Sequence, residues 1–250
     1  EGPRFIVRAL LAVVLLAVVQ AAAPPGMGML EVRNGYFWDP LKQEYFIPRG
    51  VAYQTWNPPV GANQSFAQID YDLREFKKMH ANSVRCDFTW GELEVGEGTY
   101  DWSKTDFLIA NAAELGLRLF VLVGYQYPPS WVPREYRGVN DRYTTTTDPA
   151  LVETNVLSDV INYEHPEARR LYANHIAAVT SRYRHSPAIG GWILGNEYAY
   201  YDLWEDPQRY PVRRFLGYDP ISQAAFRAFL RQFYGGDIAA LNARWGSRYV

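Results

Sequence analysis

Cysteine is almost missing from this chain of 250 residues, in which Cys86 is the only one. A disulfide framework within the chain and a cysteine-rich metal site are therefore excluded, and Cys86 is expected to be a small buried hydrophobe. An excess of charge of one sign is also lacking, because the formal net charge is −2. No basic stripe alternates with aromatic residues, so nucleic acid is not expected as a partner.

A long hydrophobic run is lacking near the N-terminus as well. The apolar stretch 9–19 follows Arg4 and Arg8 and precedes small residues and two prolines. At about eleven residues it is too short to cross a bilayer as a helix, which takes about 20. The pattern predicts a secretory signal peptide over residues 1–23 and hence a secreted or periplasmic protein. The alternatives to a signal peptide are an uncleaved membrane anchor and a buried core helix. The anchor would be the only membrane contact expected.

Hydrophobic residues make up 48% of the chain, which is enough to bury a sizeable core in one large domain or two small ones. Aromatic residues are plentiful, with eight Trp and nineteen Tyr. Surplus aromatic rings often line sugar-binding clefts, although core packing alone can account for many of them.

Hydrophobic periodicity predicts strands that alternate with helices. A leader over residues 24–47 contains a β-hairpin around Asn34-Gly35 and a further arm at 44–47, and a short buried strand follows at 48–53. The pattern then predicts a helix at 66–80, a strand at 82–88, a helix at 101–115, a strand at 117–124, a helix through 168–183, a strand at 189–194 and a later helix through 226–233. This order is typical of one parallel α/β domain.

A doubly wound sheet and a (β/α)8 barrel both fit this alternation. No Gly-rich phosphate loop follows the first strand, which weakens the nucleotide-binding alternative. Polar and aromatic residues come directly after the strands, and in a barrel they converge on the carboxyl-terminal face, where active sites are built. They are Tyr53, Gln54, Trp56, Phe88, Trp90, Tyr125, Gln126, Asn196 and Glu197. We expect residues 48–250 to be the N-terminal part of a (β/α)8 TIM barrel, truncated after about four βα units.

The stretch from Tyr125 to Glu164 has no clear period and is rich in proline and threonine. A loop of that length in a compact domain is usually functional or disordered, and above a barrel strand it would form the wall of a cleft. Tyr125, Tyr127 and Trp131 are candidate cleft residues, with packing as the alternative for each.

Glu197 is the candidate general acid/base of a retaining glycosidase. It follows a buried strand, where apolar neighbours such as Trp192 and Tyr198 would raise its pKa toward the operating pH. Asn196 beside it would hydrogen-bond the 2-hydroxyl group of a sugar, a contact that strengthens in the transition state. The alternative for Glu197 is an ordinary surface glutamate that follows a strand.

Arg85 lies within a predicted strand and is expected to be largely buried, so that its guanidinium needs an anionic partner. One interpretation is that it holds the catalytic nucleophile in its ionised form. The other is a structural ion pair with Asp87 or another acid at the end of a strand. Nearby, Glu92 and Glu94 are interpreted as structural, and Trp90 is either a sugar platform or a packing residue.

No metal site and no cofactor are predicted. The four histidines do not stand at metal-ligand spacing with carboxylates, so helix packing or surface exposure is expected for them. They are His80, His165, His175 and His185.

Several ordered segments resemble glycoside hydrolase family 42, the β-galactosidases, within the retaining (β/α)8 glycosidase clan. They are Asn82–Arg85 with Trp90, Leu93-Glu94 and Gly98–Trp102, then Pro128–Trp131, Gly191–Tyr198, Phe226–Leu230 with Tyr234-Gly235, and Ala240–Gly246. The resemblance implies that Glu197 is the proton donor, that Asn196 is a sugar ligand, and that an oligosaccharide or polysaccharide is the substrate. Tyr198, Tyr125 and Trp56 are further substrate-binding candidates. The zinc-binding cysteines of some members and an Arg-rich segment at 140–163 are absent, so a glucoside or mannoside is an alternative to a galactoside.

In this clan the nucleophilic glutamate comes from the seventh strand, and only about four strands are counted before Val250. The resemblance therefore implies a fragment that lacks its nucleophile and does not turn over by itself. Glu153 and Glu164 are disfavoured as substitutes because they lie in a loop ahead of a helix. A barrel that binds glycans without hydrolysing them is the competing hypothesis.

Overall fold

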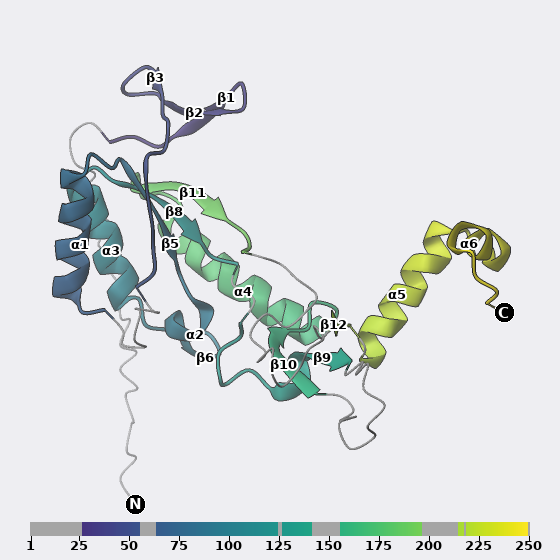
Figure 1. Cartoon of the computed structure of the whole chain (residues 1–250). Coiled ribbons are helices and arrows are strands. Elements are labelled where there is room, and N and C mark those ends of the chain that lie inside the picture. Colours follow the sequence, from purple (N-terminus) through teal and green to yellow (C-terminus); the bar gives the residue numbers. More distant parts are fainter. Residues whose placement is uncertain are drawn as a thin grey trace, which may run out of the picture.

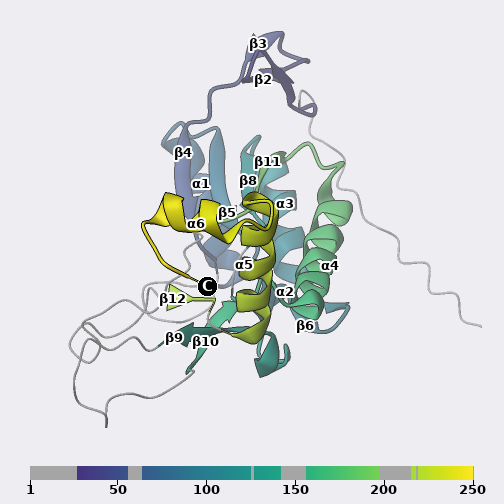
Figure 2. The same ribbon diagram turned by 90° about the vertical axis from the view of Figure 1, so that its right-hand side faces the viewer.

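A four-stranded parallel sheet is the centre of the fold. The structure, a computed structural model, describes residues 27–55, 64–124, 127–141, 156–196, 215–217 and 219–249. The predicted signal segment 1–23 lies outside this part of the chain. The strands β4 (Gly50–Tyr53), β5 (Ser83–Asp87), β8 (Arg118–Leu122) and β11 (Ile189–Ile193) run in the order β11-β8-β5-β4, as Figures 1 and 2 show. All three pairings are parallel, which confirms the predicted α/β class.

Three helices cover one face of this sheet: α1 (Phe66–Lys78), α3 (Ser103–Glu114) and α4 (Pro166–Tyr183) (Figure 1). The main core lies between them and the strands, where Ile69, Leu108 and Val179 pack against Val84 and Cys86. Because side chains alternate along a strand, Ser83, Arg85 and Asp87 point to the opposite face of β5. The positions of these helices and strands agree with the predicted ones.

Local signals in the sequence explain where the helices begin and end. Ser65 caps α1, with its hydroxyl accepting a hydrogen bond from the Gln68 amide over 3.2 Å. Helix α3 ends just before Gly116, whose φ of 65° is a left-handed conformation that glycine adopts without strain. His165 caps α4, and Pro166 occupies its first turn, where no amide hydrogen is needed.

Strand β4 lies at one edge of the sheet. Tyr53 is buried as expected, but Gly50 and Ala52 are exposed, so the prediction of a buried strand is wrong for half of its residues. The reason is its place in the sheet, since β5 pairs with only one of its two sides.

The leader forms a small antiparallel sheet of β1 (Glu31–Arg33), β2 (Tyr36–Asp39) and β3 (Glu44–Tyr45). Asn34 and Gly35 both have positive φ, as a tight two-residue hairpin turn requires. This sheet stands at the amino-terminal ends of the parallel strands (Figure 1). There the Phe37 ring meets Phe120 of β8 edge-on, with ring centroids 5.3 Å apart.

Arg118 fastens the leader to the parallel sheet. Its buried guanidinium forms an ion pair with Asp39 over 3.3 Å and donates to the carbonyl oxygens of Gly28, over 2.6 Å, and Pro187. Burial lowers the pKa of Arg118, while the neighbouring Asp39 opposes this shift. The guanidinium therefore joins the leader, β8 and the residues that precede β11.

The stretch 125–164, predicted to be a loop, contains regular structure. It holds the 3-10 helix η1 (Arg134–Tyr136) and the antiparallel strands β9 (Arg137–Asp141) and β10 (Val156–Ile161). Strand β12 (Phe215–Leu216) pairs with the other edge of β9. The prediction of a structureless loop is wrong here. The strands are recognised only through their pairing with β9, and Arg137–Asp141 shows no alternation of polar and apolar residues.

The remaining short elements are α2 (Trp90–Leu93), β6 (Glu94–Gly96) and β7 (Thr99–Tyr100), which follow β5. Near the end of the chain, α5 (Pro220–Phe233) confirms the last predicted helix and α6 (Ile238–Trp245) follows it. The two helices project away from the sheet in Figure 1, and the apolar stripe Phe226, Phe229 and Phe233 on α5 is exposed. Among the described helices, none has the length and apolar character needed to cross a membrane.

Candidate active site

Two predicted site residues meet at the carboxyl-terminal end of the parallel sheet. Nη2 of Arg85, on β5, donates a hydrogen bond to Oδ1 of Asn196 over 2.9 Å. Asn196 follows β11, so the contact passes across the intervening strand β8. The sheet order β11-β8-β5-β4 thus brings together residues that are 111 positions apart in the sequence.

Asp87 and Gln54 extend this contact toward β4. Nη1 of Arg85 lies 3.6 Å from Oδ1 of Asp87, whose side chain is only 1% exposed. Nε2 of Gln54, just after β4, donates to Oδ2 of Asp87 over 3.0 Å. Of the two interpretations of Arg85, the ion pair with Asp87 is therefore present in the structure. A contact with a nucleophilic carboxylate stays a prediction.

Arg85 is less buried than expected, because 31% of its side chain is exposed. It points from the face of β5 that turns away from helices α1 and α3, whereas its neighbours Val84 and Cys86 are fully buried against those helices. The guanidinium therefore lies at a partly open edge where a ligand can reach it. Cys86 is the small buried hydrophobe that was expected, and burial raises the pKa of its thiol.

Trp90 is fully buried, which contradicts a role as a sugar platform. Its ring packs against Trp131, Tyr172 and His175, at centroid distances of 6.3, 5.6 and 5.5 Å. Its indole Nε1 donates to Oε2 of Glu94 over 2.6 Å. The packing alternative is the correct one, because a ring enclosed on these sides offers no face to a sugar.

Glu94 has the structural role predicted for it. Besides Trp90, its buried carboxylate accepts the Gly98 amide over 2.8 Å, and its backbone oxygen accepts Nε1 of Trp131 over 2.7 Å. It thereby joins the β6–β7 hairpin to the segment after β8. Glu92 is structural too, as the ion-pair partner of Lys104.

His175 belongs to the same buried cluster. Burial lowers its pKa to about 3, so the ring is neutral at ordinary pH. Its Nδ1 lies 3.7 Å from Oε2 of Glu94, which is too long for a hydrogen bond, and a neutral ring forms no ion pair. His175 is therefore a packing residue of α4, as expected. Within the described ranges, no group of three or more His, Cys, Asp or Glu side chains is arranged to hold a metal ion.

Four predicted site residues lie outside the part of the chain that the structure describes: Glu197, Tyr198, Tyr125 and Trp56. Their roles stay predictions. Tyr53 and Phe88, which also follow strands, are buried in the core and take no part in the site.

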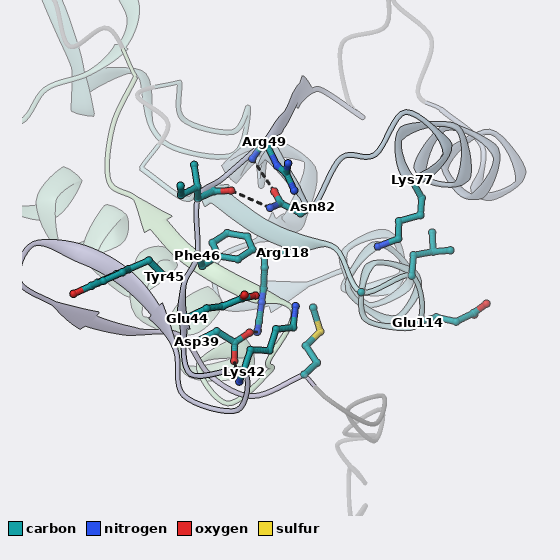
Figure 3. A pocket seen from close by; sticks show the side chains of 14 residues that line it. Asp39, Lys42, Glu44, Tyr45, Phe46, Arg49, Lys77, Asn82, Glu114 and Arg118 are labelled. Atoms are coloured by element: carbon teal, nitrogen blue, oxygen red, sulfur yellow. Dashed lines mark hydrogen bonds and ion pairs between the residues drawn. The ribbon is translucent and has the colours of Figure 1, made fainter.

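A cavity of about 610 Å³ lies at the opposite end of the sheet. Figure 3 shows it between the leader, which contributes Asp39, Lys42 and Glu44, and the carboxyl-terminal ends of α1 and α3, which contribute Lys77 and Glu114. It borders residues that precede or begin the strands, whereas the contact of Arg85 with Asn196 lies beyond their far ends. A smaller cavity of about 200 Å³ lies close to the candidate site, with Asp87, Thr89 and Lys104 in its wall.

The fold is that of a parallel α/β protein. Its polar residues converge at the carboxyl-terminal ends of the parallel strands, which defines a candidate site there. The sequence profile of glycoside hydrolase family 42, described as β-galactosidase, matches residues 56–249. The chain belongs to this family.

Individual relatives agree with this membership. A β-galactosidase of Thermus thermophilus is 29% identical over 181 residues, which cover 71% of this chain and 25% of that protein. A β-galactosidase of Arthrobacter sp. is 26% identical over 166 residues, which cover 65% of this chain and 21% of the relative. The chain thus spans about a quarter of the length of these curated relatives.

Solved structures show the same fold. A family 42 β-galactosidase from G. stearothermophilus, a catalytic mutant, aligns with a TM-score of 0.57 at 24% identity, covering 80% of this chain and 26% of that one. The β-galactosidase of Halorubrum lacusprofundi aligns with a TM-score of 0.55 at 24% identity, covering 79% and 26%.

Proposed function

We propose that the chain is part of a retaining β-glycosidase that hydrolyses β-galactosides. The observation that carries the proposal is the contact between Arg85 and Asn196 at the carboxyl-terminal edge of the parallel sheet, in a chain of family 42. The relatives named above are β-galactosidases, which favours a galactoside over the glucoside and mannoside alternatives.

The fold of the whole catalytic domain is, in this proposal, a (β/α)8 barrel. The four strands of the central sheet are parallel and carry helices on one face, as the wall of such a barrel does. Arg85 and Asp87 then point from β5 toward the barrel interior, and the leader stands at the amino-terminal end of the barrel. The predicted signal segment 1–23 adds the proposal that the protein is exported, which mass spectrometry of the mature N-terminus tests.

The proposed reaction has two steps. In the first, a carboxylate nucleophile attacks the anomeric carbon, the glycosidic C–O bond breaks, and Glu197 transfers its proton to the departing oxygen. In the second, Glu197 takes a proton from water, the water oxygen attacks the same carbon, and the bond to the nucleophile breaks. In this proposal the nucleophile comes from the seventh barrel strand, as the resemblance to the clan implies.

Arg85 and Asn196 have separate tasks in this scheme. The positive charge of Arg85 at the floor of the site favours the ionised form of a nearby carboxylate. Asn196 hydrogen-bonds the 2-hydroxyl group of the sugar, and this contact strengthens as positive charge develops on the ring.

The test compares Glu197→Ala with wild type in the full-length protein. For an aryl β-galactoside whose leaving group needs protonation, kcat/KM should fall by at least about 100-fold, because general acid catalysis is lost. For an activated dinitrophenyl galactoside the first step should be almost unchanged. Glu92→Gln, at the ion pair with Lys104, is the matched control and should retain wild-type rates.

Undiminished turnover of the unactivated substrate by Glu197→Ala would remove Glu197 from the mechanism. Binding of galactose by the wild-type protein without turnover of any aryl glycoside would favour the glycan-binding alternative.

A further inference from the structure

Four side chains form a continuous chain of polar contacts along the carboxyl-terminal edge of the sheet. Gln54 contacts Asp87 over 3.0 Å, Asp87 lies 3.6 Å from Arg85, and Arg85 contacts Asn196 over 2.9 Å. Gln54 follows β4, Arg85 and Asp87 lie on β5, and Asn196 follows β11, so the contacts run across the full width of the four-stranded sheet.

The chemistry of the partners dictates how each amide is turned. A guanidinium carries only hydrogen-bond donors, so Asn196 must present Oδ1 to Arg85. An ionised carboxylate carries only acceptors, so Gln54 must present Nε2 to Asp87. At the Asn196 end, Nδ2 is therefore the atom that is left to meet a ligand, and it can only donate.

We propose that Asp87 and Gln54 are positioning residues that act through Arg85 to fix Asn196 as a hydrogen-bond donor to the 2-oxygen of the substrate. The inference rests on the proposed function, in which Asn196 meets the 2-hydroxyl group. It adds that discrimination at the 2-position depends on two residues that do not touch the sugar.

The burial pattern supports this assignment. The Asp87 side chain is almost fully buried, while that of Arg85 is 31% exposed. The carboxylate is therefore held inside the protein, and the guanidinium that it orients faces the site. A long arginine side chain at a partly open edge has several rotamers, and the charge of Asp87 favours the one that reaches Asn196. Gln54 in turn holds the second oxygen of Asp87, which keeps the first oxygen directed at Arg85.

The experiment uses Asp87→Asn, which keeps the shape of the side chain and removes its charge. In the full-length protein, kcat/KM is measured for 4-nitrophenyl β-galactoside and for its 2-deoxy analogue. With the parent substrate the variant should lose about 10-fold, because Asn196 is no longer fixed as the donor to the 2-oxygen. With the 2-deoxy analogue the loss should be less than about 3-fold, because the contact that Asp87 positions is not made.

Asp39→Asn is the matched control. Asp39 is also a buried aspartate paired with an arginine, but its pair with Arg118 lies at the opposite end of the same sheet. This variant should change the rates on the two substrates by the same factor. Gln54→Leu should resemble Asp87→Asn with a smaller effect, because it leaves the charge of Asp87 in place.

Equal losses on both substrates for Asp87→Asn would overturn the proposal, since a merely structural residue does not distinguish them. An unchanged rate on both substrates would also overturn it.

A binding measurement keeps this test separate from the proposed hydrolysis. By calorimetry, the wild-type protein should bind galactose about 10-fold more tightly than 2-deoxygalactose, and Asp87→Asn should bind the two equally. If no substrate is hydrolysed but this difference in affinity is present, the proposed hydrolysis fails while the positioning role stands. If wild type does not prefer galactose, the positioning role fails.

Discussion

The guanidinium of Arg85 and the side-chain amide of Asn196 lie 2.9 Å apart although 111 residues separate them in the sequence. Their meeting depends on β8 lying between β5 and β11, so the order of strands in the sheet assembles the candidate site. No single helix, turn or hairpin brings the two residues together.

Arg85→Lys should lower kcat/KM for an aryl β-galactoside by about 10-fold or more with little change in stability. A lysine ammonium is a single point charge and cannot contact Asp87 and Asn196 with two separate nitrogens. Steady-state kinetics and urea unfolding measure the two effects. Arg74→Lys, at an exposed ion pair on α1, is the control and should alter neither. Wild-type kinetics in Arg85→Lys would show that the guanidinium geometry does not matter.

Trp90→Ala should lower the free energy of unfolding by about 3–5 kcal/mol, because it empties a fully buried site between Trp131, Tyr172 and His175. Trp90→Phe keeps much of the packing and should cost less, since it mainly removes the hydrogen bond to Glu94. Urea titration measures both. The galactose affinity of the folded variants should be unchanged. A stable Trp90→Phe protein with weakened sugar binding would restore the sugar-platform interpretation.

Asp39→Ala should destabilise the protein by about 3–5 kcal/mol, because it leaves the buried charge of Arg118 without its ion-pair partner. Glu31→Gln, at the exposed ion pair with Arg33 in the same leader, should change stability by less than about 0.5 kcal/mol. Thermal and urea unfolding compare the two. If both substitutions have the same small effect, the leader is not fastened through Arg118.

His175 makes stability depend on pH. In the unfolded chain its pKa is about 6.5, whereas burial lowers it to about 3 in the fold. Between these values the unfolded state binds more protons, so the free energy of unfolding should decrease as the pH falls from 6.5 toward 3, by about 1 kcal/mol per pH unit. His175→Leu should remove this part of the slope. Urea unfolding of both proteins at pH 6.5 and 4.5 measures it, and identical slopes would contradict the assignment.

Much of the fold could be predicted from the sequence because its signals are local. The spacing of Ile69 and Leu73, the cap at Ser65 and the stop at Gly116 each define a helix or its end within a few residues. The apolar run through β8 likewise indicates a strand of a parallel sheet.

The site could be predicted only in part. Asn196 and Arg85 stand out in the sequence, and their contact agrees with a shared site. The positioning role of Asp87 has a weaker signal, the alternation of polar and apolar residues in Ser83–Asp87, which places Arg85 and Asp87 on one face of β5. That Gln54 would contact Asp87 depends on the register of β4 against β5, which a single sequence does not reveal.

Other features depend on distant partners. Trp90 resembles a sugar platform in the sequence because it follows a strand, and only the packing of α4 and Trp131 around it shows that it is buried. Strands β9 and β10 were missed for the same reason, since each is short and is stabilised by the other.

The contacts of Arg118 also bear on the time at which the leader can dock. Its partners Gly28, Asp39 and Pro187 are 90, 79 and 69 residues away in the sequence. During synthesis at about 5–20 residues per second, Pro187 follows Asp39 by roughly 7 to 30 seconds. Throughout that interval the leader is already made but its fastening point is incomplete. Chain elongation, rather than the intrinsic speed of hairpin formation, therefore sets when the amino-terminal end of this sheet closes.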